Sequence, residues 1–154
     1  MFDMKIVDIY TDGACSGNPG MGGYCAILLY NGVEKVVSGF EEETTNNRME
    51  LLAVIRGLEC LKEKCEVNLY SDSRYVVDAF QQDWITNWQS NGWKTSNKKE
   101  VKNIDLWTRL LEFVSVHKIN FIKVKGHADN EYNNRCDKIA VEEYKRQNKL
   151  KTEN

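Results

Sequence analysis

The sequence predicts an α/β domain in which helices pack on a mixed, five-stranded sheet. Three strand-like segments come first and are joined by turns, as in an antiparallel meander. Helical and strand-like segments then alternate, which favours parallel strands in the rest of the sheet. With 154 residues, of which 42% are hydrophobic and 29% charged, the chain is long enough to bury a full hydrophobic core.

The first half of the predicted sheet is the meander. Its first strand covers residues 5–12, and a turn-rich loop over 13–20 follows. The second strand, 22–30, is joined to a third at 33–40 by Asn31-Gly32, the strongest short signal for a hairpin. These three strands are therefore expected to pair in an antiparallel manner.

The second half alternates between helices and strands. Leu51, Val54, Ile55 and Leu58 recur at helical spacing, and Thr44-Thr45 supplies capping residues before them, so a helix is expected over 47–62. The remaining expected elements are a strand at 67–71, a helix beginning at 75–80, an irregular segment at 84–102, a helix at 104–116, a strand at 119–124 and a helix at 133–149.

The chain is expected to form one domain over residues 1–154, with a core at about 5–147 and a polar, frayed tail at 148–154. It contains no run of 18 apolar residues and begins without a signal-peptide pattern, so we expect no membrane association and a cytoplasmic location. Its five cysteines include no C-x-x-C pair, which favours reduced thiols. Nothing in the sequence indicates an obligate interface, so we expect a monomer.

Two segments of the sequence repeat one pattern at the end of a predicted strand. They are Ile9-Tyr10-Thr11-Asp12-Gly13 and Leu69-Tyr70-Ser71-Asp72-Ser73. Functional sites in open α/β sheets gather at the carboxyl ends of strands. If the two strands are neighbours, Asp12 and Asp72 lie close together, which is unfavourable without a cation between them.

Two further acids lie on the inward stripes of predicted helices. Glu50 shares a stripe with Val54 and Leu61, and Asp137 shares one with Ala140. Either acid alone could instead pair with an arginine or cap a neighbouring element. Four inward carboxylates together favour a hard divalent ion, Mg²⁺ first and Mn²⁺ second, and two such ions suit phosphodiester hydrolysis.

The net charge of −2 does not by itself indicate a nucleic-acid partner, but the charge is unevenly distributed. The 84–102 segment holds four lysines and one glutamate, a local balance of +3, and all four tryptophans lie within 24 residues. Some of the tryptophans, such as Trp84 and Trp107, are expected to pack on the body. We expect the lysines to meet a nucleic-acid backbone.

One of the two histidines, His127, lies in a predicted loop ten residues before Asp137. Histidine in this position could move protons or assist product release. A single loop histidine more often has no catalytic role, and spacing alone leaves both interpretations open.

Motifs along most of the chain carry a resemblance to a known family. In order they are Thr11-Asp12-Gly13 with Gly17-Asn18-Pro19-Gly20, Thr45-Asn46-Asn47-Arg48-Met49-Glu50-Leu51, Asp72-Ser73 with Tyr75-Val76, Gly92-Trp93-Lys94-Thr95 with Lys102-Asn103, and Val124-Lys125-Gly126-His127 with Arg135-Cys136-Asp137. From about residue 5 to 144 the sequence resembles bacterial-type ribonuclease H, type 1.

The resemblance implies the ribonuclease H-like fold and a Mg²⁺-dependent endonuclease. Such an enzyme cuts the RNA strand of RNA–DNA hybrids with two metal ions and leaves 3′-hydroxyl and 5′-phosphate ends. By match, the metal-binding catalytic carboxylates are Asp12, Glu50, Asp72 and Asp137, with His127 as a mobile auxiliary. The residues that the resemblance places at the substrate are Cys15, Asn18, Thr45, Asn46, Asn47, Arg74, Trp88, Trp93, Lys94, Lys98, Lys99 and Asn103.

Within that set, Cys15, Asn18, Asn46 and Asn47 are implied to face the minor groove of the hybrid. There the 2′-hydroxyl groups distinguish the RNA strand, so little base specificity is expected. Thr45 and Asn103 are implied to meet a phosphate of the DNA strand.

The sequence departs from the bacterial pattern at several positions. Arg74 stands where glutamine is common, Glu43 where some relatives carry arginine, and Gln89 and Ser90 where basic versions carry lysine. Since the changes at 43, 89 and 90 remove attraction to phosphates, we expect weaker hybrid binding with intact chemistry. Residues 129–134 also form a variant loop.

Three alternatives remain open at this point. A DNA-directed nuclease of the same fold would not need a loop that faces 2′-hydroxyl groups. A hybrid-binding module without catalysis would not need all four acids. Sugar-kinase and actin-like ATPases share the strand-end aspartate and a glycine loop, but they need a second domain.

Overall fold

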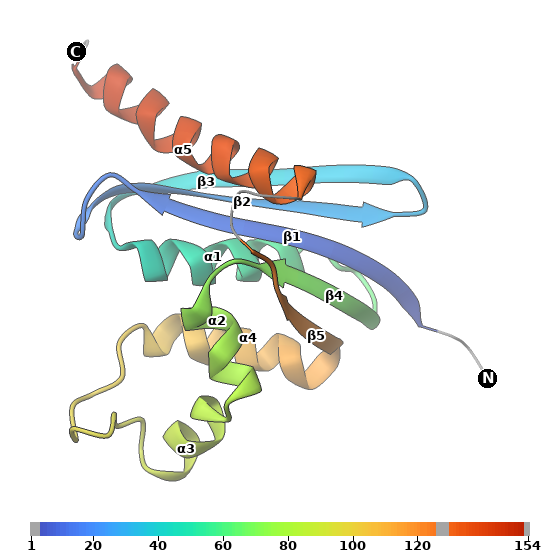
Figure 1. The fold of residues 1–154 in the computed structure, drawn as a ribbon, viewed down its shortest axis with the longest axis vertical. Coiled ribbons are helices and arrows are strands. Elements are labelled where there is room, and N and C mark those ends of the chain that lie inside the picture. The colour runs from blue at the N-terminus through green and yellow to red at the C-terminus, as the bar shows by residue number, and fades with distance from the viewer. Residues whose placement is uncertain (1–3, 126–129, 153–154) are drawn as a thin grey trace.

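The computed structural model describes residues 4–125 and 130–152, and it confirms the predicted fold class. Within these residues a five-stranded sheet has the order β3-β2-β1-β4-β5 (Figure 1). Strands β1 (Lys5–Cys15), β2 (Gly20–Tyr30) and β3 (Val33–Thr44) form the antiparallel meander. Strands β4 (Cys65–Ser71) and β5 (Lys118–Lys123) extend the sheet in parallel with β1.

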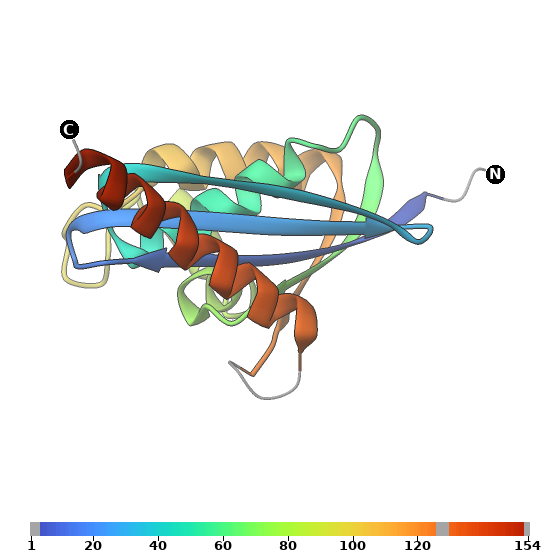
Figure 2. The ribbon, with the colours of Figure 1, turned by 90° about the horizontal axis from the view of Figure 1, so that it is seen from above.

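Helices cover both faces of the sheet. Helix α5 (Glu131–Thr152) crosses β1, β2 and β3 on one face, and α1 (Asn46–Leu58) lies on the other, with α4 (Ile104–Val116) beside it (Figures 1 and 2). Helices α2 (Arg74–Gln81) and α3 (Trp84–Ser90) lead away from the end of β4. No helix in the described ranges is both long enough and apolar enough to cross a membrane.

Several boundaries differ from the sequence predictions. Strands β1 and β3 continue to Cys15 and Thr44, because their pairing with β2 extends past the predicted ends. Helix α1 ends at Leu58 rather than at residue 62. The 84–102 segment, expected to be irregular, contains α3. The tail, which was expected to be frayed, is helical to Thr152. Lysines in its last turn interact favourably with the negative end of the helix dipole.

The main core lies between the sheet and the α1 and α4 helices. Helix α1 is covered by the sheet on one side and by α4 on another, so it is buried over most of its length, and Glu50 is only 3% exposed. A smaller core lies beneath α5 and is formed by Cys25, Ile27, Cys136 and Ala140. All five cysteines, which lie within the described residues, are free thiols, as predicted.

Candidate active site

Three acids from three different elements converge at one end of the sheet. Asp12 lies on β1, Asp72 follows the end of β4, and Glu50 lies on α1. One carboxylate oxygen from each lies within 4.8 Å of the others. The two strands are parallel neighbours in which Tyr10 pairs with Tyr70, so both aspartates follow the same sheet position. The predicted convergence of the strand ends is therefore observed.

Gly13 holds Glu50 against the sheet. Its backbone N–H donates to Glu50 Oε1 at 2.7 Å and also contacts Asp12 Oδ1 at 3.0 Å. A Cβ atom at position 13 would lie 2.5 Å from the backbone nitrogen of Glu50, so only glycine permits this approach of α1 to β1. The same close approach therefore sets the position of the helical acid.

The other oxygen of Glu50, Oε2, is buried and has no hydrogen-bond partner among the residues that the structure describes. A buried carboxylate oxygen without a partner is costly. Burial and the charge of Glu50 raise the pKa of Asp12, and burial raises the pKa of Glu50. An all-oxygen donor set with one unsatisfied acceptor fits a hard divalent cation, which would favour the charged forms of both groups.

The fourth predicted acid, Asp137, reaches the same place from α5. It lines a cavity of about 440 Å³ together with Asp12, Glu50 and Asp72, although it is not part of the group within 4.8 Å. Its neighbours Cys136 and Ala140 are fully buried against the sheet, which confirms that this side of α5 faces inward. His127 lies outside the described residues.

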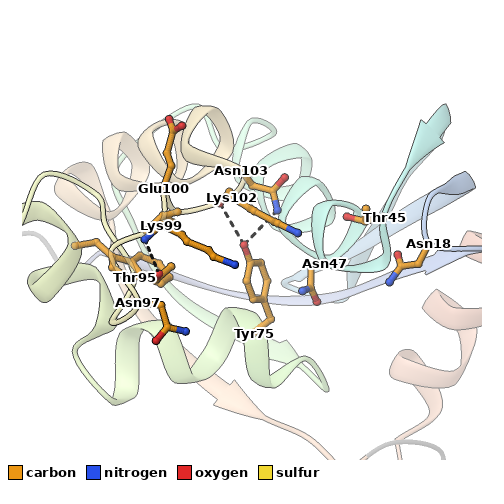
Figure 3. A pocket seen from close by; sticks show the side chains of 12 residues that line it. Asn18, Thr45, Asn47, Tyr75, Thr95, Asn97, Lys99, Glu100, Lys102 and Asn103 are labelled. Atoms are coloured by element: carbon orange, nitrogen blue, oxygen red, sulfur yellow. Dashed lines mark hydrogen bonds between the residues drawn. The ribbon is translucent and has the colours of Figure 1, made fainter.

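A second cavity of about 470 Å³ adjoins the first, and the two share Asn47 and Tyr75 in their linings. Figure 3 shows this second cavity between the start of α1 and the 84–102 segment. The side chains of Lys99 and Lys102 extend into it from the 84–102 segment, and Thr45 lies at its other end (Figure 3). An acidic cavity thus continues into one that offers cations and amides.

Tyr75 organises the second cavity, although the sequence did not single it out as a site residue. Its hydroxyl accepts from Asn103 Nδ2 at 3.2 Å and from Trp107 Nε1 at 3.1 Å, and it donates to the carbonyl of Lys102 at 3.4 Å. Asn103 Oδ1 in turn accepts from Arg48 at 3.4 Å. These partners lie about 30 residues from Tyr75, so no local pattern could reveal the contacts.

The profile of the RNase H family matches residues 4–145, which include both cavities. The chain belongs to the ribonuclease H family. It is 64% identical over 146 residues to the ribonuclease H of Acetivibrio thermocellus, covering 95% of this chain and 99% of that one. It is 62% identical over 144 residues to the ribonuclease H of Thermoanaerobacter sp., covering 94% and 93% of the two chains.

A solved structure of the same family has a similar fold. It is LC9-RNase H1, described as a type 1 RNase H with the type 2 active-site motif. The TM-score is 0.83 at 30% identity, and the match covers 96% of this chain and 75% of that one.

The structure divides the substrate residues implied by the ribonuclease H resemblance between the two cavities. Asn46, Asn47 and Arg74 line the acidic cavity. The second cavity is lined by Asn18, Thr45, Asn47, Trp88, Lys99 and Asn103.

Four of the implied substrate residues line neither cavity. Lys94 lines a separate hollow beside Trp84 and Trp88. The Cys15 thiol donates to the carbonyl of Gly17, Trp93 packs against the main core, and Lys98 is exposed on the 84–102 segment.

The tryptophans follow the expected mixture. Trp107 is fully buried, whereas Trp84, Trp88 and Trp93 are partly buried against the core. Trp88 lies at the centre of this aromatic group and contacts the other three, with ring centroids 5.5 to 6.2 Å apart. The aromatic side chains therefore dock the 84–102 segment, and its lysines remain exposed.

Proposed function

We propose that this ribonuclease H cuts the RNA strand of RNA–DNA hybrids as a Mg²⁺-dependent endonuclease. The observation that carries the proposal is the group of three carboxylates with the orphaned Glu50 Oε2, in a cavity that opens toward lysine side chains. Asp12, Glu50, Asp72 and Asp137 would hold two Mg²⁺ ions, with Mn²⁺ as a substitute. When bound, the ions supply activation of the attacking water and stabilisation of the leaving oxygen.

The protein side chains have separate tasks in this proposal. The four carboxylates would hold the ions at the strand ends, and the products would carry 3′-hydroxyl and 5′-phosphate ends. His127, which precedes α5 in the sequence, would move a proton or assist product release. Asn46 and Asn47, at the start of α1, lie beside the carboxylates and can hydrogen-bond to 2′-hydroxyl groups.

The DNA strand would lie along the second cavity. Thr45 and Asn103 line it and would meet one phosphate, and Lys99 adds positive charge beside them. Asn103 uses its amide to contact Tyr75 and Arg48, so it is held in place before substrate arrives. Recognition would depend on the shape and sugars of the hybrid rather than on base identity.

A cleavage assay on end-labelled substrates of one sequence tests the proposal. The expected result is rapid cutting of the RNA strand in the hybrid, little cutting of duplex DNA, and complete loss of activity with a chelator. Preferential cutting of duplex DNA would support the DNA-directed alternative instead. Binding without any cutting, over a range of Mg²⁺ and Mn²⁺ concentrations, would support a module without catalysis.

A further inference from the structure

The position of Asp137 depends on how α5 sits on the sheet. Asp12 lies in β1 where it pairs with β2, Asp72 directly follows β4, and Glu50 is fixed by the Gly13 N–H. Asp137 comes from a helix on the opposite face of the sheet from α1 (Figure 1). Whatever holds the first turns of α5 therefore sets the distance between Asp137 and the other three acids.

Three tyrosines connect the first turn of α5 to the strands that carry the aspartates. The rings of Tyr10 and Tyr70 stack, with centroids 4.5 Å apart and an interplanar angle of 9°. Tyr132 of α5 contacts Tyr10 with centroids 5.0 Å apart. Each strand tyrosine precedes an aspartate by two residues, and alternate strand residues point to the same face. The stack therefore lies on the face where Asp12 meets α5.

An ion pair also connects the start of α5 to the sheet. Arg135 donates to both carboxylate oxygens of Glu34 on β3, at 2.6 and 2.8 Å. Its guanidinium also lies 5.7 Å from the centre of the Tyr132 ring. The arginine thus ties α5 to the far edge of the meander and contacts the tyrosine that stacks on β1.

Further along, α5 touches the sheet through its backbone. A Cβ at Gly23 of β2 would collide with the carbonyl oxygen of Ala140, so the helix rests directly on the strand there. The Cys136 thiol donates to the carbonyl of Tyr10 at 3.2 Å. The glycine contact fixes the helix beyond Asp137, and the tyrosine and arginine contacts fix it before Asp137.

We propose that Tyr132 and Arg135 are positioning residues that place Asp137 at the metal cavity, through a clamp formed with Tyr10, Tyr70 and Glu34. The inference rests on the proposed function, because it takes Asp137 as a metal ligand. None of the clamp residues is among those that line the acidic cavity. They act on the chemistry only by holding the first turns of α5 at a constant distance from the strand ends.

Four variants test the clamp: Tyr132→Leu, Tyr132→Phe, Arg135→Gln and, as a matched control, Arg146→Gln. Arg146 also lies on α5 and pairs with Glu143, within the helix itself. Three quantities are measured for each variant. The first two are the Mg²⁺ concentration that gives half-maximal cleavage and the KM for hybrid. The third is the rise in melting temperature on adding Mg²⁺, which requires no activity.

Tyr132→Leu should raise the half-maximal Mg²⁺ concentration about 2- to 10-fold, the factor that corresponds to one lost aromatic contact, and leave the KM for hybrid unchanged. Tyr132→Phe keeps the aromatic ring and should have the same half-maximal Mg²⁺ concentration as the wild type. Arg135→Gln should raise the concentration about 2-fold, because its ion pair is partly exposed. Arg146→Gln should match the wild type.

A double-mutant cycle distinguishes positioning from general support of the fold. In an Asp137→Asn background, Tyr132→Leu should cause no further change in the Mg²⁺-dependent rise in melting temperature. An equal effect in both backgrounds would overturn the proposal. So would unchanged Mg²⁺ dependence in Arg135→Gln, a surface variant that decides the matter if Tyr132→Leu does not fold. Failure of the wild type to cut hybrid would refute the proposed function instead, and the melting experiment would still test the clamp.

Discussion

Replacing Asp12 by asparagine tests whether the carboxylates are held together against their own repulsion. The side chain is 4% exposed, and asparagine has nearly the same shape, so packing should be preserved. We expect the variant to lose hydrolysis, because the carboxylate that we propose as a metal ligand becomes a neutral amide. In the absence of metal, the same variant should be more stable to unfolding than the wild type.

The size of this gain follows from the geometry. Two unit charges at the 4.8 Å limit of the group repel by about 3.5 kcal/mol at an effective dielectric constant of about 20. Burial already favours protonation of Asp12, so proton uptake relieves part of that repulsion. We therefore expect the free energy of unfolding to rise by about 1–3 kcal/mol at neutral pH.

The raised pKa of Asp12 also determines how the stability gain from asparagine changes with pH. The folded protein holds a proton on Asp12 at pH values where the unfolded chain, with a pKa near 3.8, has released it. The contribution of Asp12 to stability therefore falls as the pH rises above about 4, and the gain from asparagine should be larger at pH 8 than at pH 5. Saturating Mg²⁺ should reduce the difference in unfolding free energy between Asp12→Asn and the wild type, because it stabilises the wild type more than the variant.

Urea unfolding with a chelator, at several pH values, measures these differences. Asp105→Asn is a control for which the opposite change in stability is expected. Asp105 pairs with Arg48, and this contact lowers the pKa of Asp105, so loss of the ion pair should slightly destabilise the protein. An Asp12→Asn protein that is no more stable than the wild type without metal would refute the reasoning. The carboxylates would then be compensated by contacts within the fold rather than by a cation.

Three further outcomes are expected. Lys98→Ala with Lys99→Ala should weaken hybrid binding and reduce the slope of log affinity against log salt by up to about 2, measured by fluorescence anisotropy; an unchanged slope would place the phosphate contacts elsewhere. Gly13→Ala should force α1 away from β1, lower the free energy of unfolding by about 1–3 kcal/mol in urea, and weaken Mg²⁺ binding. His117 Nδ1 accepts from the Cys65 N–H, and burial lowers the pKa of His117. The free energy of unfolding should therefore fall as the pH drops below about 6.5. His117→Gln should reduce this dependence on pH, measured by urea unfolding.

Much of the candidate site could be predicted because its signals are local. Asp12 and Asp72 stand at strand ends, and the alternation of side chains along a strand is a property of the backbone. The inward positions of Glu50 and Asp137 follow from helical periodicity. The extra length of β1 and β3 was missed because it depends on pairing with β2, and helix α3 because its few turns are stabilised by the packing of Trp84 and Trp88 on the core.

The sequence by itself determined the acids, their elements and the family, because these depend on spacing of a few residues and on motifs in a constant order. The tertiary structure alone decided how the acids are held. Residues far apart in the chain form these contacts: the Gly13 N–H bonds to Glu50, Tyr75 bonds to Trp107, and the ring of Tyr132 packs on that of Tyr10. Such contacts depend on strand register and helix placement, which only the packed core establishes.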